Sequence, residues 1–302
     1  MALFAGELNE VAPKRPVDVC VVGTYIFSAF QNDATSGLMP NGAFAVLSTS
    51  TEVALAYAGL PSSQGVGNFN AFSAASGGGY AWVIPNNLGY FYRITPTSGA
   101  VTSYWISSPD ASSSAWGLNA TSTHIIAHRI GLSTVARISL STFTVSMSGS
   151  SAAIAGRATS DGSILHYING NGNYATYDPT TDTFTVIGAA GAADPTGRGF
   201  VDSGLWWYPT ATGVVSKMTT SPYTATTYTH TLTPGGNIAS TSDLVKHSDG
   251  KFYAYGASDY LIAFDPSNGS FGKEALTPSR SRRYNLCSAA GKLWLPSGEP
   301  LN

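Results

Sequence analysis

Charged side chains are scarce in this sequence: Asp, Glu, Lys and Arg make up 11% of its 302 residues, against roughly 25% in an average soluble protein. Residues that fill the solvent-facing side of helices are therefore few, which favours strands. The formal net charge of −2 gives too weak a field to attract nucleic acid or an anionic membrane surface. The one basic cluster, Arg280, Arg282 and Arg283, is predicted to be a solvated loop.

Cysteines are also few, and we expect neither a leader peptide nor an apolar run that spans a membrane. Cys20 and Cys287 are the only cysteines and do not make a disulfide framework. The first residues, MALFAGE, lack the basic segment of a secretory signal peptide. Residues 53–92 carry no charge, but Gly, Ser, Asn and Pro interrupt them too often for a membrane helix. We expect a soluble chain without membrane insertion, made in a cytoplasm and retained there unless it is assembled into a particle.

No catalytic or cofactor motif is present: the sequence has no Walker loop, dinucleotide-binding glycine pattern or nucleophile elbow. His124 and His128 lie in a segment predicted to be a strand, where a four-residue separation is about 13 Å, too far to share a metal ion. Asp161 and Asp249, each within Ser-Asp-Gly, differ from the Asp-box of sialidases, because one residue separates Asp from Gly in that box. We therefore expect no cofactor, no metal site and no catalytic residue.

A repeat of about 40 residues runs through the chain. In its clearest copies, residues 160–182 and 248–269, a Ser-Asp-Gly turn precedes two apolar segments and an Asp-Pro turn. Gly suits a tight hairpin that needs positive φ, and Pro fixes φ at the second turn. The first turns of all copies are anchored at Gly42, Gly79, Thr123, Gly162, Gly204, Gly250 and Gly291. The second turns fall at Pro96, Leu140, Pro179, Pro222 and Pro266.

Short strands at this period, without helical periodicity, are typical of β-propeller blades. Residues 160–182 and 248–269 resemble the blade repeats of kelch, quinoprotein-like and YVTN-type propellers. The resemblance implies an all-β fold, with residues 1–302 as one propeller of seven blades, or of six if the strand runs in residues 23–57 are counted differently. The kelch double glycine and the WD dipeptide do not recur, so the resemblance implies a fold and no activity.

The last anchor, Gly291, has only eleven residues after it, too few for two further strands. In propellers that this chain resembles, the N-terminal segment completes the final blade. We therefore expect residues 1–22, with a strand at Val17–Val22, to close the ring by pairing with the blade of Gly291. Cys287 would lie on an inner strand and Cys20 on an outer one, too far apart for a disulfide, so both thiols should be free.

Aromatic residues in loops or at strand ends are the candidate binding residues, whereas Trp82 and Trp294 are expected in the core. The candidates are Trp105, Trp116, Trp206, Trp207, Tyr223 and Tyr228. Low Lys content and Ser/Thr/Gly/Asn-rich strands resemble bacteriophage virion proteins. The predicted function is a non-enzymatic tail- or fibre-associated part, present in multiple copies, that contacts other virion proteins or a cell-surface glycan. A glycan-binding or sialidase-like glycan-cleaving propeller and a cytoplasmic scaffold are the alternatives.

Overall fold

The computed structural model describes residues 15–31, 43–51, 54–59, 72–85, 90–106, 116–149, 152–191, 193–210, 214–219, 224–229, 238, 242–256, 260–275, 285–294 and 300–301. These residues form antiparallel sheets of consecutive strands. Among them, no helix has the length and hydropathy that crossing a bilayer requires.

Seven sheets follow one another along the described chain. The first sheet contains β1 (Arg15–Val22), β2 (Tyr25–Gln31), β3 (Ala43–Ser48) and β4 (Ala54–Gly59). The second contains β5 (Phe72–Gly77), β6 (Tyr80–Pro85), β7 (Tyr90–Ile94) and β8 (Val101–Trp105). The third contains β9 (Trp116–Ala120), β10 (His124–Arg129), β11 (Thr134–Ser139) and β12 (Val145–Gly149). The fourth contains β13 (Thr159–Ser160), β14 (Leu165–Ile168), β15 (Asn173–Asp178) and β16 (Thr183–Ala189).

The remaining three sheets complete the series. The fifth contains β17 (Phe200–Asp202), β18 (Leu205–Thr210), β19 (Val214–Thr219) and β20 (Ala225–Thr229). The sixth contains β21 (Val245–Lys246), β22 (Phe252–Gly256), β23 (Tyr260–Asp265) and β24 (Ser270–Ala275). The seventh contains β25 (Cys287–Ala289), β26 (Lys292–Trp294) and β27 (Pro300–Leu301). Six sheets thus have four strands each, which matches the six blades of the alternative count. The seventh sheet has three strands among the described residues.

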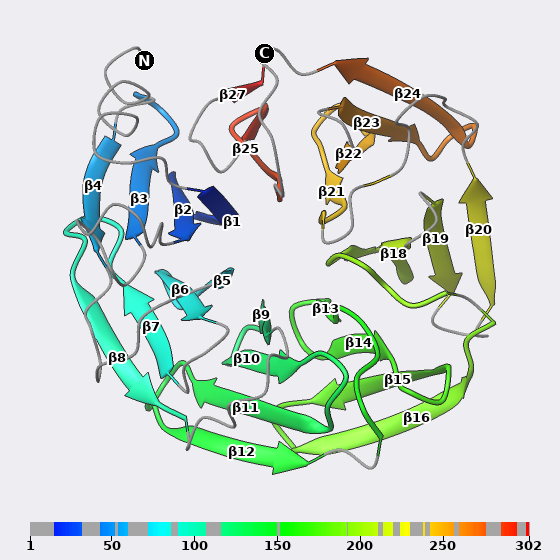
Figure 1. The fold of residues 1–302 in the computed structure, drawn as a ribbon, viewed down its shortest axis with the longest axis horizontal. Helices are drawn as coiled ribbons and strands as arrows, with labels where there is room; N and C mark the ends of the chain where they lie inside the picture. Colours follow the sequence, from blue (N-terminus) through cyan, green and yellow to red (C-terminus); the bar gives the residue numbers. More distant parts are fainter. Residues whose placement is uncertain are drawn as a thin grey trace.

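The sheets stand around a common axis as the blades of a propeller (Figure 1). The first strand of each sheet lies nearest the axis and the last strand lies on the outside. Burial follows this order: in the third sheet β10 is almost wholly buried, β11 is partly buried and β12 has no buried residue. The all-β propeller expected from the repeat is confirmed.

Seven apolar clusters hold the ring together, one at each interface between neighbouring sheets. Successive side chains of a strand point to opposite faces of its sheet. On β6, Ala81 and Val83 therefore pack on the first sheet while Trp82 and Ile84 pack on the third. Inner strands need apolar residues at almost every position, because both of their faces are covered.

The turns expected from the repeat recur at equivalent places. Gly79, Gly162, Gly204, Gly250 and Gly291 each lie in the turn between the first and second strands of a sheet, with φ from +72° to +94°. The second turns at Pro96, Leu140, Pro179 and Pro266 each lie between third and fourth strands. Pro222 and Gly42 lie outside the described residues.

In the first sheet the corresponding turn falls at Gly23, between β1 and β2. Gly42 immediately precedes β3, so its role as the anchor of the first copy was wrong. The error arose because Asn-Gly is a hairpin signal that carries no information on which hairpin of a sheet it serves.

The expected pairing of the strand at Val17–Val22 with the blade of Gly291 was also wrong, and residues 1–14 lie outside the described residues. Val17–Val22 lies within β1, which pairs with β2, whereas Gly291 joins β25 to β26 in the seventh sheet. The ends of the ring meet by packing instead. Val19 and Ile26 of the first sheet bury apolar surface against Cys287 and Trp294 of the seventh.

Cys20 and Cys287 are both free and buried, as predicted, but for a different reason. Each lies on the innermost strand of its sheet, β1 or β25. Cys20 packs between the first and second sheets, and Cys287 packs between the seventh and first. The first sheet therefore separates the two side chains.

Candidate functional site

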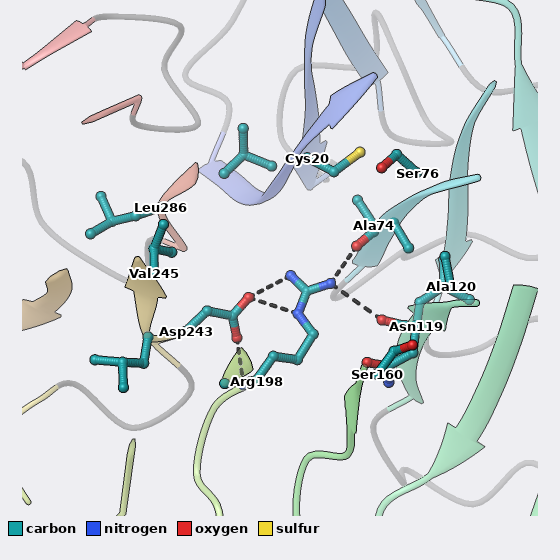
Figure 2. A pocket seen from close by; sticks show the side chains of 15 residues that line it. Cys20, Ala74, Ser76, Asn119, Ala120, Ser160, Arg198, Asp243, Val245 and Leu286 are labelled. Atoms are coloured by element: carbon teal, nitrogen blue, oxygen red, sulfur yellow. Dashed lines mark hydrogen bonds and ion pairs between the residues drawn. The ribbon is translucent and has the colours of Figure 1, made fainter. Parts of the chain in front are cut away.

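Arg198 lies at the centre of the ring, in the segment that leads into β17 (Figure 2). Its Nε donates to Asp243 Oδ2 at 2.7 Å, and its Nη2 lies 2.5 Å from the same oxygen and 2.6 Å from Asp18 Oδ1. Its Nη1 donates to the carbonyl oxygens of Ala74 and, at 3.3 Å, Leu118. The guanidinium thus makes four hydrogen bonds and two ion pairs, with acceptors from four other sheets.

Arg198 stays protonated. Burial lowers the pKa of its guanidinium, but the adjacent carboxylates of Asp18 and Asp243 outweigh burial and raise that pKa overall. The side chain of Asp18 is 1% exposed and that of Asp243 is 8% exposed. Arg198, Asp18 and Asp243 form a buried ion triad, and the charge of the buried Arg157 guanidinium also acts on both carboxylates.

Hydrogen bonds of two further side chains, Asn285 and Ser73, connect the triad to neighbouring sheets. Asn285, which precedes β25, donates from Nδ2 to Asp18 Oδ1 at 2.7 Å, and its Oδ1 accepts from the backbone N–H of Asp243 at 3.2 Å. The Ser73 hydroxyl of β5 donates to Asp18 Oδ2 at 3.4 Å and accepts from the backbone N–H of Leu118 at 2.9 Å. The first, second, third, sixth and seventh sheets are thereby connected.

The fourth sheet joins through two residues. Arg157 donates from Nη1 to Ser73 Oγ at 3.4 Å, and Thr159 Oγ1 accepts from the backbone N–H of Gly199 at 2.9 Å. All seven sheets thus meet in one set of bonds, which we call the central polar network. Its side chains are those of Asp18, Ser73, Arg157, Thr159, Arg198, Asp243 and Asn285.

The histidine nearest this network is neutral. Burial, and then the charge of Arg157, lower the pKa of His128 to about 3. Its Nε2 accepts from the backbone N–H of Ala158 at 3.3 Å. His124 occupies the first position of the same strand, β10, and is half-buried. Within the described ranges, no group of three or more His, Cys, Asp or Glu side chains could hold a metal ion.

A pocket of about 300 Å³ lies on the axis beside the Arg198–Asp243 pair (Figure 2). Its lining comes from the innermost strands of the first, second, third, fourth and sixth sheets and from the segments just before β17 and β25. The Arg198–Asp243 pair forms its charged part, and Asn119 and Ser160 are among its uncharged polar residues. Asn119 is 5% exposed, and its Nδ2 has no hydrogen-bond partner among the described residues.

The structure describes the side chains of four of the six candidate aromatic residues, Trp105, Trp206, Trp207 and Tyr228, and these four do not form one exposed surface. Trp105 lies on the outermost strand β8 with half of its surface exposed, and its ring meets Tyr90 edge-on at 4.6 Å. Tyr228, on the outermost strand β20, is half-buried against Trp207. Trp116 is the first residue of β9, but its side chain lies outside the described part of the chain, as does the whole of Tyr223.

The expectation that Trp206 and Trp207 are exposed was wrong. They are 0% and 5% exposed and lie on β18, the second strand of its sheet, both faces of which are covered. The predicted core positions of Trp82 and Trp294 are confirmed, both at 0% exposure. The basic cluster at 280–283 lies outside the described residues.

Sequence reasoning missed the central polar network, although one signal was available. Asp18 stands between Val17 and Val19 in an otherwise apolar strand. Because a buried carboxylate needs a partner, an acid in such a strand indicates an ion pair. Nothing in the sequence indicates that the partner is Arg198, which is 180 residues away.

No family model matches the chain, and no curated protein matches it. Many solved structures share its fold. A catalytically inactive variant of virginiamycin B lyase from Staphylococcus aureus with quinupristin is 13% identical, with 95% of this chain and 94% of that chain covered and a TM-score of 0.71. BamB from Moraxella catarrhalis is 14% identical, with coverage of 90% and 80% and a TM-score of 0.54.

At these identities the likeness shows a β-propeller fold and no more. It supports the propeller part of the resemblance seen in the sequence, and it does not favour the kelch, quinoprotein or YVTN type. One of the two similar proteins is an enzyme by name, so the fold does not decide between catalysis and binding.

Proposed function

We propose that this chain is a non-enzymatic interaction propeller that serves as a virion component, tail- or fibre-associated and present in multiple copies. The non-enzymatic part of this proposal rests on the central polar network, whose charged groups are paired and hydrogen-bonded within the protein. Arg198 makes four side-chain hydrogen bonds and two ion pairs within the protein, and Asp18 accepts from Arg198, Asn285, Ser73 and two backbone amides.

A catalytic centre needs titratable groups that face the substrate with shifted pKa values. At this axis the charged groups stabilise the ring, and His128, with its pKa near 3, stays neutral at any physiological pH. The acids that a sialidase-like site would need are also committed elsewhere. Asp161 accepts from the backbone N–H groups of Ser163 and Ile164, and Asp249 accepts from that of Lys251.

The outer strands provide the contact surface in this proposal. β8 (VTSYW) and β20 (ATTYT) contain no charged residue, and their exposed positions are mainly Ser and Thr. Unpaired strand edges without charges readily accept a partner's backbone. Trp105 adds an exposed aromatic ring, which suits either a neighbouring protein or the face of a sugar in a cell-surface glycan.

The decisive test is to purify particles of the virus that encodes the chain and to quantify the chain by mass spectrometry. The proposal expects a fixed ratio to the other particle proteins. Trp105→Ser should reduce incorporation, whereas Val186→Ser, at a similarly exposed apolar residue of another outer strand, should reduce it less. Absence of the chain from particles would overturn the virion role. Hydrolysis of a glycan panel by the purified chain would overturn the non-enzymatic role.

A further inference from the structure

We propose that Arg93 and the aromatic rings around it form a docking site for the carboxylate of an acidic residue on a partner protein. The site lies towards the outside of the ring, where β7 and β8 of the second sheet face the turn between β11 and β12 of the third (Figure 1). The proposal names the chemistry of a partner, so it rests on the interaction role proposed above. The site is separate from the central polar network.

The guanidinium of Arg93 lies against three aromatic rings. Its Cζ is 4.2 Å from the ring centroid of Phe143, 4.6 Å from that of Tyr80 and 5.5 Å from that of Tyr104. The side chain is partly buried, but in the described part of the chain its guanidinium makes no hydrogen bond or ion pair, and none of its nitrogens is both buried and unpartnered. The nitrogens are therefore open to solvent. Because cation–π contacts leave the N–H groups in the plane of the guanidinium unpaired, the donors of Arg93 are free to bind a ligand.

A second arginine occupies the equivalent position in the next sheet. Arg93 of β7 pairs with Thr102, the second residue of the outer strand β8. Arg137 of β11 likewise pairs with Ser146, the second residue of the outer strand β12. The Nη1 of Arg137 lies 3.0 Å from Asp182 Oδ1, which belongs to the following sheet. At this position of a sheet, an arginine therefore reaches across to its neighbour and binds a carboxylate.

The place of Asp182 is taken in the third sheet by Phe143. Asp182 comes four residues after the end of β15, and Phe143 comes four residues after the end of β11. The two residues have nearly the same left-handed backbone, with φ of +58° and +56°. A positive φ is uncommon for a bulky side chain and marks a conformation that its surroundings hold. The ring of Phe143 packs on the guanidinium of Arg93, so this arginine is positioned as Arg137 is but has no acid to bind among the described residues.

An acidic side chain matches the free donors of this site. The planar fork of a guanidinium fits the two oxygens of a carboxylate and holds both at once. Thr102 lies directly opposite Arg93 and is exposed, so its hydroxyl is available as a further contact. In the equivalent pair the acceptor is an aspartate on a turn of a protein chain, namely Asp182. The matching ligand is therefore an Asp or Glu side chain that a partner presents on an exposed turn.

The test is titration of the purified full chain, followed by NMR at the Nε–H signal of Arg93. The probes are acetyl-Gly-Asp-Gly-amide, the uncharged acetyl-Gly-Asn-Gly-amide and glucuronate. The Asp peptide should bind with a Kd of about 1–10 mM, as expected for one charge-assisted bidentate contact. The Asn peptide should bind at least about tenfold more weakly, because it lacks the charge. Glucuronate should bind no more tightly than the Asp peptide, since the fork contacts only its carboxylate.

Each probe can contradict a separate part of the proposal. Equal binding of the Asn peptide would overturn the role of the charge, and no binding of any probe would overturn the site. Tighter binding of glucuronate would overturn the protein partner in favour of an acidic glycan. The titration needs no particles, so a failure of the virion role and a failure of this site are distinguishable.

Three variants locate the binding at Arg93. Arg93→Gln should abolish binding of the Asp peptide, and Arg93→Lys, which keeps the charge but not the fork, should weaken it at least about fivefold. Phe143→Asp keeps Arg93 and supplies a carboxylate where Asp182 stands in the next sheet, so it should occupy the site and exclude the added peptide. Lys251→Gln, at an exposed lysine in the turn between β21 and β22, is the matched control and should bind as the wild type does. Unchanged binding by a folded Arg93→Gln or Phe143→Asp variant, with folding checked by thermal melting, would overturn the proposal.

Discussion

Replacing Arg198 by Met should destabilise the whole propeller. The substitution keeps an unbranched side chain in place and removes the charge and four hydrogen bonds that reach four other sheets. Asp18 and Asp243 then lose the guanidinium that pairs with both of them, while they stay buried with side chains that are 1% and 8% exposed. Breaking a buried ion pair from one side typically costs about 3–5 kcal/mol. Because all three groups are well shielded from water, no large reduction for solvent screening applies.

This cost translates into a measurable shift in melting temperature. At about 2.1 cal/mol/K per residue, a chain of 302 residues has an unfolding entropy of roughly 0.6 kcal/mol/K, so the Tm should fall by about 5–8 °C. Differential scanning calorimetry at neutral pH measures it. Adding Asp18→Asn to Arg198→Met should recover part of the loss, because one uncompensated charge is removed.

A surface ion pair supplies the matched control. Lys246 Nζ lies 2.8 Å from Asp202 Oδ2, but the two side chains are 45% and 38% exposed. Lys246→Met should therefore change the stability by less than about 1 kcal/mol. If Arg198→Met melts within about 2 °C of the wild type, or no lower than Lys246→Met, the reasoning that the central polar network holds the ring is refuted.

Three further predictions follow from local geometry. Burial raises the pKa of Asp161, but hydrogen bonds from His166 and two backbone amides outweigh burial and hold that pKa at about 2, below the ordinary 3.8. The ionised Asp161 therefore stabilises the fold by about 1 kcal/mol after solvent screening, and this contribution is present above pH 4 and is lost as the pH falls from 4 to 2. Asp161→Asn should flatten a plot of Tm against pH in that range. Ala290→Gly should raise the free energy of unfolding by about 1 kcal/mol in a denaturant titration, because Ala290 has φ of +51° in an exposed turn. As the control, Ala289→Gly within β25 should lower the free energy of unfolding in the same titration. Cys20 and Cys287 are free and buried, and burial raises the pKa of both thiols, so alkylation of the native chain should be slow. In denaturant without reductant, intact-mass analysis should find two alkyl labels. A chain that takes no label in denaturant would contain the disulfide that the structure excludes.

The sequence determined the class of fold and the position of most turns. A hairpin glycine and a proline turn are local requirements on φ, so Gly79 and Pro96 could be placed without any knowledge of their neighbours in space. Scarce charge indicated strands, and the repeat of about 40 residues indicated propeller blades.

The tertiary structure alone decided what meets at the axis and how the ring closes. The bond between Arg198 and Asp18 joins residues 180 positions apart, and no local pattern encodes such a contact. The burial of Trp206 could not be predicted from its own segment either, because its 0% exposure results from packing against the neighbouring sheet. Closure by packing of β1 against β25 likewise depends on the twist and size of every blade in between, a property of the assembled ring that no single repeat contains.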